Sequence, residues 1–214
     1  MKVGLMMVIR NEDERIEECL KYHTHYFDGI VIVDQESDDQ TQQRVKLFIN
    51  KFRLKYPDKQ IQLWIDENWG HCEPSRKVAG NILQAIDMDW AVYLDPDEKL
   101  PIEFLDSMHA WADLIEFDGF KLKRENSFDV QVYDESIQVE PKWLHVKHPV
   151  IEEQFRMFRL SAAQYPDGLH TRIRVRDKNG NESIKSLPYV IEHRKKLTEM
   201  WDDLHRYKQI RNRK

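Results

Sequence analysis

The sequence predicts an α/β protein in which a mostly parallel, Rossmann-like central sheet is flanked by helices. In the first half of the chain, short apolar runs alternate with segments whose apolar residues recur at helical spacing. The apolar runs are continuous, as is typical of strands that are buried on both faces. Strand–helix alternation of this length implies right-handed crossovers between parallel strands.

Four apolar runs are the predicted strands of the first half, over residues 3–9, 30–33, 61–65 and 90–94. A helix is expected after each of the first three. Asn11 is expected to cap the first helix, because the three residues that follow it are acidic and suit a helix N-terminus. The second helix should turn Val45, Ile49 and Phe52 inward, and the third spans about residues 75–87.

The second half has a different pattern. A helix is expected over residues 101–114, followed by short strand-like pieces at residues 117–124, 130–134, 153–160 and 171–175. Loops rich in Pro, Asp and His separate these pieces. We expect a small region of mixed sheet that covers and extends the parallel core.

Composition indicates one soluble domain. The chain has 214 residues and a net charge of −5, which argues against general nucleic-acid binding. No apolar run reaches the roughly 18 residues that a transmembrane helix needs, and the N-terminal run is interpreted as a strand rather than a signal peptide. Cys19 and Cys72 are isolated, which suits a reducing compartment, and we expect a cytoplasmic protein.

Residues 193–214 form the one strongly basic stretch of the chain. This basic stretch has two possible interpretations. The first is a solvated basic helix or tail, and the second is a site for an anionic partner, including peripheral contact with a membrane surface.

Distinctive polar residues follow three of the four predicted strands, in the stretches RNE (10–12), DQESDD (34–39) and DPDE (95–98). In open α/β sheets, ligands bind outside the carboxyl ends of the strands. The chain has neither a GxGxxG nor a GxxxxGK[ST] motif, so a phosphate group would have to be held in another way.

Asp95 and Asp97 lie two positions apart directly after a predicted buried strand, so their carboxylates can share a hard divalent cation. This D-x-D spacing is a weak signal alone. A second pair, Asp87 and Asp89, lies at the other end of the same strand, where we expect it to cap or turn. A metal site and an acidic turn are therefore both open at this point.

Four stretches in order, MVIRNEDERIEECL, GIVIVDQESDDQT, PSRKVAGNILQA and WAVYLDPDEKLP, resemble the nucleotide-sugar half of family 2 glycosyltransferases. The lipopolysaccharide-core and tail-glycosylating type is the most similar. The resemblance covers residues 3–101. It implies a single GT-A domain over residues 1–214, with a nucleotide-sugar-binding half (1–101), an acceptor-side half (102–192) and the basic C-terminus (193–214).

The resemblance also implies the reaction and its partners. These are an inverting, metal-dependent transfer from a nucleoside-diphosphate sugar, in particular a UDP-sugar, to a glycan or glycolipid acceptor, with Mn²⁺ or Mg²⁺ as cofactor. The donor-binding residues would be Asn11, Glu12, Asp34, Arg76, Lys77 and Asp95. Gln35 and Glu36 depart from the family pattern, which puts base contact at these positions in doubt.

The matches in the second half are looser. By resemblance, the metal ligands would be Asp97, with Asp95, His170 and His193 as further candidates. Thr171 replaces an acidic residue of the family, so the catalytic base is open between Glu152, Glu153 and Asp167.

Two other functions remain as alternative hypotheses. A GT-A module that binds a nucleotide or glycan without turnover would account for the departures at Gln35, Glu36 and Thr171. Nucleotidyl transfer ranks last, because residues 10–15 lack the glycine of a phosphate loop. Single residues have structural alternatives too: Asp34 and Asp39 as helix caps, Arg76 as a surface residue, the histidines as structural groups, and Trp69 and Trp143 as core residues rather than sugar-stacking ones.

Overall fold

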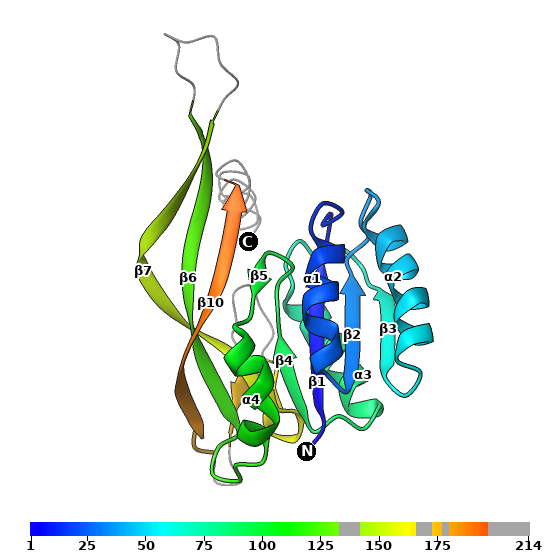
Figure 1. Cartoon of the computed structure of the whole chain (residues 1–214). Helices are drawn as coiled ribbons and strands as arrows, with labels where there is room; N and C mark the ends of the chain where they lie inside the picture. Colours follow the sequence, from blue (N-terminus) through cyan, green and yellow to red (C-terminus); the bar gives the residue numbers. More distant parts are fainter. Residues whose placement is uncertain (133–141, 166–172, 177–179, 197–214) are drawn as a thin grey trace.

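The computed structural model describes residues 1–132, 142–165, 173–176 and 180–196, and within these only the backbone of residues 128–132, 142–150 and 194–196. The described residues form an eight-stranded sheet in the order β3-β2-β1-β4-β7-β6-β10-β5 and a two-stranded sheet of β8 and β9 (Figure 1). The α/β prediction with a mostly parallel, helix-flanked sheet is confirmed.

The first four strands are parallel, with β1 (Val3–Ile9) between β2 (Gly29–Asp34) and β4 (Trp90–Tyr93), and β3 (Gln60–Ile65) at the edge. All seven residues of β1 are buried, which explains the continuous apolar run. The helices between these strands are α1 (Ile16–His23), α2 (Thr41–Lys55) and α3 (Glu73–Ala85), and a 3₁₀ turn, η1 (Thr24–Tyr26), follows α1.

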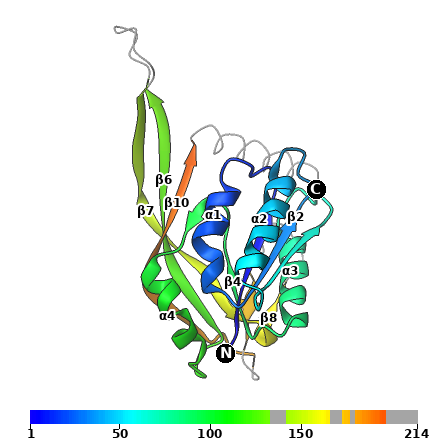
Figure 2. The ribbon, with the colours of Figure 1, turned by 45° about the vertical axis from the view of Figure 1, so that its right-hand side comes forward.

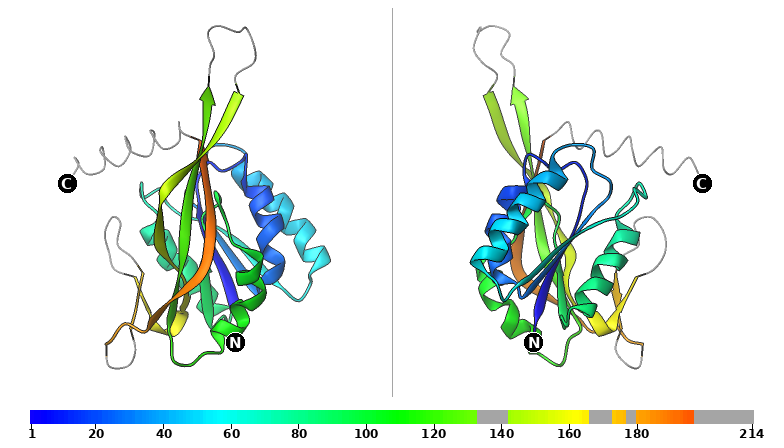
Figure 3. Two further views of the ribbon diagram at one scale, coloured as in Figure 1. Left: turned by 60° about the vertical axis from the view of Figure 1, so that its left-hand side comes forward. Right: turned by 90° about the vertical axis from the view of Figure 1, so that its right-hand side faces the viewer.

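The sheet has a core on each face, with α3 on the face opposite α1 and α2 (Figure 3). Leu5 and Met7 of β1 lie in the core with α1, α2 and α4 (Ile102–Ala112), and Met6 and Val8 lie in the core with α3. This alternation follows from the two-residue period of a strand.

The second half adds β5 (Glu98–Lys99), β6 (Gly119–Val132), β7 (Lys142–Arg159) and β10 (Ile184–Lys196) to the same sheet. Strand β7 pairs antiparallel with both β4 and β6, whereas β10 runs parallel to β6 and antiparallel to β5. The β6–β7 hairpin extends beyond the rest of the sheet (Figure 2). The small sheet of β8 (Ala163–Gln164) and β9 (Arg174–Val175) follows the 3₁₀ turn η2 (Leu160–Ala162).

Several local expectations were wrong. Residues 117–124 and 130–134 were expected as separate pieces, but Gly119–Val132 is one strand. Residues 193–196, expected to open the basic helix or tail, end strand β10, and the rest of that stretch lies outside the described residues. Asn11 does not cap α1, because the helix begins at Ile16. The backbone of Asn11 is left-handed (φ 54°), and its side-chain oxygen accepts a hydrogen bond from the backbone N–H of Asp38.

The second D-x-D pair turns the chain, as expected. Asp87 ends the α3 region in a left-handed conformation (φ 59°), and the carboxylate of Asp89 accepts a hydrogen bond of 2.7 Å from the backbone N–H of Lys2. No helix in the described ranges is long and apolar enough to cross a membrane.

Candidate functional site

The loops that follow β1 and β2 lie side by side at the carboxyl edge of the sheet. Ile9 pairs with Asp34 in the parallel register, so the next residues of both strands emerge together. The backbone N–H of Asn11 donates to Ser37 Oγ (2.9 Å), and that of Glu12 donates to Thr41 Oγ1 (2.7 Å). Asn11 and Glu36 are both left-handed, with φ of 54° and 52°. Strained backbone of this kind is enriched at functional sites.

Asp34 and Gln35 hold this edge together from inside. The Asp34 carboxylate is fully buried and accepts hydrogen bonds from the backbone and hydroxyl of Ser37 and from Gln42 Nε2. Gln35 Nε2 donates to the His71 carbonyl (2.8 Å) and to Ser75 Oγ (2.9 Å) at the start of α3. Asp34 therefore fixes the loop that follows β2, and Gln35 connects the end of β2 to the start of α3.

The D-x-D-E segment forms a tight turn between β4 and β5. The backbone N–H of Asp95 donates to Glu98 Oε2 (3.2 Å), and the backbone N–H of Glu98 donates to the Asp95 carbonyl (3.1 Å). The Glu98 side chain is buried, whereas that of Asp95 is 31% exposed. The sequence therefore turns one carboxylate inward and presents its neighbours at the sheet edge.

His193 is brought to this turn by sheet pairing, because β10 pairs with β5 through the positions of His193 and Glu98. Its Nε2 lies 3.1 Å from Asp97 Oδ2, and its Nδ1 lies 2.7 Å from Asn126 Oδ1. Arg15 Nη1 lies 4.0 Å from the same Asp97 oxygen, and Arg15 Nε lies 3.1 Å from Glu12. Two segments far apart in the chain thus meet at Asp97.

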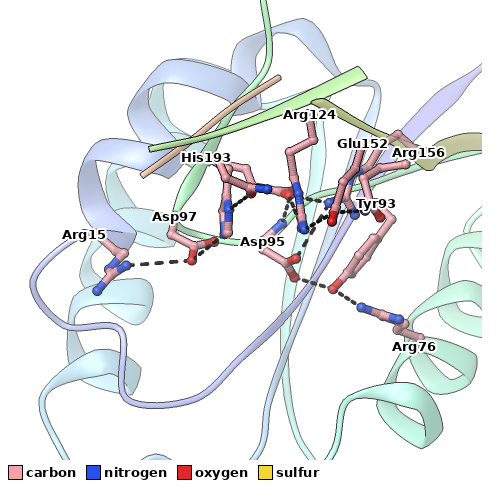
Figure 4. A network of polar contacts seen from close by, with 12 residues as sticks. Arg15, Arg76, Tyr93, Asp95, Asp97, Arg124, Glu152, Arg156 and His193 are labelled. Atoms are coloured by element: carbon pink, nitrogen blue, oxygen red, sulfur yellow. Dashed lines mark hydrogen bonds and ion pairs between the residues drawn. The ribbon is translucent and has the colours of Figure 1, made fainter. Parts of the chain in front are cut away.

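A buried ion pair between Arg156 and Glu98 supports the turn, and Figure 4 shows its arginine in the same network as Arg124 and Asp95. Arg156 of β7, which is 3% exposed, donates to Glu98 Oε1, and Arg124 of β6 lies 3.6 Å from that same oxygen. Burial raises the pKa of Glu98, and the Arg156 guanidinium opposes this effect. Burial also disfavours the charge on Arg156, but Glu98 and Asp95 outweigh it and raise the pKa of Arg156. The arginine therefore stays charged beneath the acidic turn.

Tyr93, the last residue of β4, connects the turn to α3. Its hydroxyl donates to Asp95 Oδ1 and accepts a hydrogen bond from Arg76 Nη2 (Figure 4). Arg76 is thus part of the site rather than an unrelated surface residue. Lys77, the next donor candidate, is exposed on α3.

Two of the three candidates for the catalytic base, Glu152 and Glu153, lie among the described residues. Glu152 accepts hydrogen bonds from Arg124 (3.0 Å) and Gln154 (3.2 Å), which joins it to the polar network. Glu153, the next residue of β7, is exposed, and its backbone pairs with Lys123. Asp167 and His170 lie outside the described residues.

The loop between β3 and α3 completes the edge. Asn68 donates its backbone N–H to Glu36 (3.3 Å), and Trp69 is 47% exposed with its indole N–H 3.3 Å from Asp66 Oδ2. Trp69 is therefore not a core residue. The side chain of Trp143 lies outside the described part of the chain.

The distance between the Asp97 and His193 side chains suits two neighbouring ligands of a divalent cation. Mg²⁺ takes octahedral ligands at about 2.1 Å, which places adjacent ligand atoms about 3 Å apart, and the two side-chain atoms are separated by 3.1 Å. The described residues contain no group of three or more His, Cys, Asp or Glu side chains suited to a metal ion. Further ligands would have to be phosphate oxygens and water, which is usual for Mg²⁺.

Several members of the site did not stand out in the sequence. Tyr93 lies in a predicted buried strand, and the sequence predicts no role for Arg15, Arg124, Asn126 and Arg156. Only Tyr93 had a usable signal. It lies two residues before Asp95, so an extended backbone places the two side chains on the same face.

Comparison with solved structures identifies the fold. S. aureus TarS in complex with UDP-GlcNAc is similar with a TM-score of 0.54 and 18% identity, over 91% of this chain and 59% of that one. The chain has the GT-A fold. S. aureus TarS in complex with UDP matches over 59% of this chain and 36% of that one, with 22% identity and a TM-score of 0.47.

A synthase, 4-diphosphocytidyl-2C-methyl-D-erythritol synthase, matches this GT-A chain over 76% of each protein, with 11% identity and a TM-score of 0.46. The chain spans less than two thirds of the length of the TarS chains. No protein-family model and no curated protein sequence matches it.

Proposed function

We propose that the protein is a metal-dependent, inverting glycosyltransferase that moves a sugar from a nucleoside-diphosphate sugar, in particular a UDP-sugar, to a hydroxyl of a glycan or glycolipid. The observation that carries the proposal is the 3.1 Å approach of His193 to Asp97 on a GT-A fold, at the edge where β1, β2 and β4 end. Ligands of open α/β sheets bind at this edge.

Donor binding is assigned to the loops that meet there. Asn11 and Glu12 follow β1, and Arg76 reaches the turn from α3 through Tyr93. Arg76 Nε is buried without a hydrogen-bond partner among the described residues, and a diphosphate oxygen would satisfy it. Asp34 acts through the loop that it holds, because its own oxygens are already occupied.

Asp97 and His193 would hold Mn²⁺ or Mg²⁺, with Asp95 beside them. When bound, such a cation supplies Lewis-acid stabilisation of the charge that develops on the leaving diphosphate. Arg76 offers a planar guanidinium suited to the same oxygens. The buried Arg156–Glu98 pair keeps the acidic turn in place.

The transfer step requires a base. The acceptor oxygen bonds to the anomeric carbon as the bond from that carbon to the diphosphate oxygen breaks, and the diphosphate leaves with the electron pair. The hydroxyl proton passes to a carboxylate on the acceptor side. Both Glu152 and Glu153 are exposed, and Glu152 is assigned this role because it joins the polar network through Arg124.

Nucleotide binding and sugar release test the proposal together. UDP should raise the melting temperature of the protein, Mn²⁺ should increase the effect, and Asp97→Ala should remove the increase. Incubation with a panel of UDP-sugars should then release UDP. A protein that no nucleoside diphosphate stabilises, with or without Mn²⁺, is not a glycosyltransferase of this kind.

A binding module without turnover is the second candidate. It is favoured by the hydrogen bonds that Glu152 accepts from Arg124 and Gln154, since these partners already occupy the carboxylate that would have to take the acceptor proton. It predicts UDP binding without donor hydrolysis or transfer. Nucleotidyl transfer would instead release pyrophosphate from a nucleoside triphosphate, which the same panel can include.

A further inference from the structure

Tyr93 occupies an unusual position for a strand tyrosine, because two guanidinium groups lie against its ring. The Cζ atoms of Arg76 and Arg156 lie 4.0 Å and 5.0 Å from the ring centroid. Only 4% of Tyr93 is exposed. Cation–π contacts on this ring therefore hold Arg76 on the α3 side and Arg156 on the β7 side.

The Tyr93 hydroxyl bridges two groups of opposite charge. It has one proton, which it donates to Asp95 Oδ1, and it accepts a hydrogen bond from Arg76 Nη2 (Figure 4). A neutral group thus stands between a guanidinium and a carboxylate that would otherwise attract each other directly.

The separation of Arg76 from Asp95 affects how Arg76 can bind a diphosphate. Arg76 is partly buried, and a guanidinium that pairs with a carboxylate in a partly dry site gives up N–H groups that a phosphate needs. We propose that Tyr93 is a positioning residue whose hydroxyl keeps Arg76 and Asp95 apart, and so keeps the Arg76 guanidinium available to the donor diphosphate. This inference rests on the proposed function above.

The chain offers a matched pair of Tyr→Phe variants. Tyr93→Phe keeps the ring that both arginines contact and removes only the oxygen that bridges Arg76 and Asp95. Tyr165→Phe removes a buried hydroxyl that has no hydrogen-bond partner among the described residues and that packs against Gly80. Both changes delete one oxygen atom, but only the first touches Arg76 and Asp95.

The experiment measures the affinities of UDP and uridine for the wild type and both variants by ligand-observed NMR titration with the diamagnetic Mg²⁺ present. We expect Tyr93→Phe to weaken UDP binding about tenfold, which corresponds to the loss of about 1.4 kcal/mol, and to leave uridine binding unchanged. Tyr165→Phe should change neither. Uridine lacks the diphosphate, so a general distortion of the site would weaken both ligands.

A double-mutant cycle with Arg76→Ala tests the pathway. In the Arg76→Ala background, Tyr93→Phe should have no further effect on UDP affinity, since the two residues act as one unit. Unchanged UDP affinity in Tyr93→Phe, equal weakening of UDP and uridine, or additive effects in the cycle would each overturn the inference while leaving the proposed function standing. Absence of UDP binding to the wild type would overturn both.

Discussion

His193 Nε2 lies 3.1 Å from Asp97 Oδ2, although 96 positions separate the two residues in the chain. The pairing of β5 with β10 sets this distance, since His193 lies opposite Glu98, the neighbour of Asp97. The two-residue strand β5 therefore positions a histidine at the D-x-D turn.

If this pair holds the cation, Asp97→Asn and His193→Ala should each weaken the Mn²⁺-dependent part of UDP affinity by at least about tenfold, the lower end of the losses seen for partners of metal ligands. Titration of UDP with and without Mn²⁺ measures it. Asp87→Asn is the matched control, because it removes one carboxylate from the second D-x-D pair at the far end of β4. A Mn²⁺ effect that survives in Asp97→Asn would place the cation elsewhere.

Glu152→Gln should lower the turnover number by about 10²-fold or more, the usual contribution of a general base, while UDP affinity changes little. The reason is that Glu152 belongs to the half proposed to bind the acceptor and contacts Arg124 rather than the donor loops. Glu153→Gln, one position along β7, should leave turnover unchanged. Equal rates in the two variants would point to a base outside the described residues.

The parallel half of the fold was predictable from the sequence for a physical reason. Strands buried on both faces must be continuously apolar, and residues 3–9 and 30–33 are. Strand β10 was not predicted. Its sequence contains Pro188 and several charges, and its register shifts between Ser186 and Val190, so it has neither a continuous nor an alternating apolar pattern.

The residues of the candidate site likewise include some that the sequence predicted and others that it did not. Asp95, Asp97 and Arg76 follow strands or open helices in recognisable motifs, so their neighbourhood could be expected. The partners of these residues come from tertiary pairing: Arg156 is buried only because β7 pairs with β4, and Asn126 meets His193 only because β6 pairs with β10. Sequence spacing carries no information about such contacts.

The buried pair under the turn should dominate local stability. Arg156→Ala leaves Glu98 buried without its main partner, and removing one member of a buried pair typically costs about 3–5 kcal/mol. Urea denaturation measures the loss. Arg124→Ala, at a partly exposed arginine 3.6 Å from the same carboxylate, should cost clearly less. Equal losses would show that Glu98 is shared evenly by the two arginines.

Stability should also depend on pH through His23, which is 1% exposed and joins the end of α1 to the segment after β5. Its Nδ1 lies 2.8 Å from the Cys19 carbonyl, and its Nε2 accepts a hydrogen bond of 3.1 Å from the backbone N–H of Leu100. These partners require the neutral ring with its proton on Nδ1. A second proton would face the Leu100 N–H.

Burial lowers the pKa of His23 to about 4, and the nearby Lys99 adds to the effect, while the hydrogen bond to Cys19 opposes it. The unfolded chain takes up this proton near pH 6.5, so it binds more protons than the native state between pH 6.5 and 4. The contribution of His23 is therefore fully present above pH 6.5 and is lost as the pH falls to about 4. At about 1.4 kcal/mol per pH unit, the loss is about 3 kcal/mol.

Urea denaturation at a series of pH values between 7.5 and 4 checks this expectation. His23→Gln should be less stable than the wild type at pH 7.5, and its free energy of unfolding should fall less steeply towards pH 4, so that the two curves converge. His25→Gln is the comparison, because His25 is exposed two positions away and makes the smallest of the contributions to the pKa of His23, so its loss should change the slope much less than His23→Gln does. Parallel curves for the wild type and His23→Gln would show that folding does not lower the pKa of His23, which would contradict the neutral, hydrogen-bonded ring inferred from its contacts with Cys19 and Leu100.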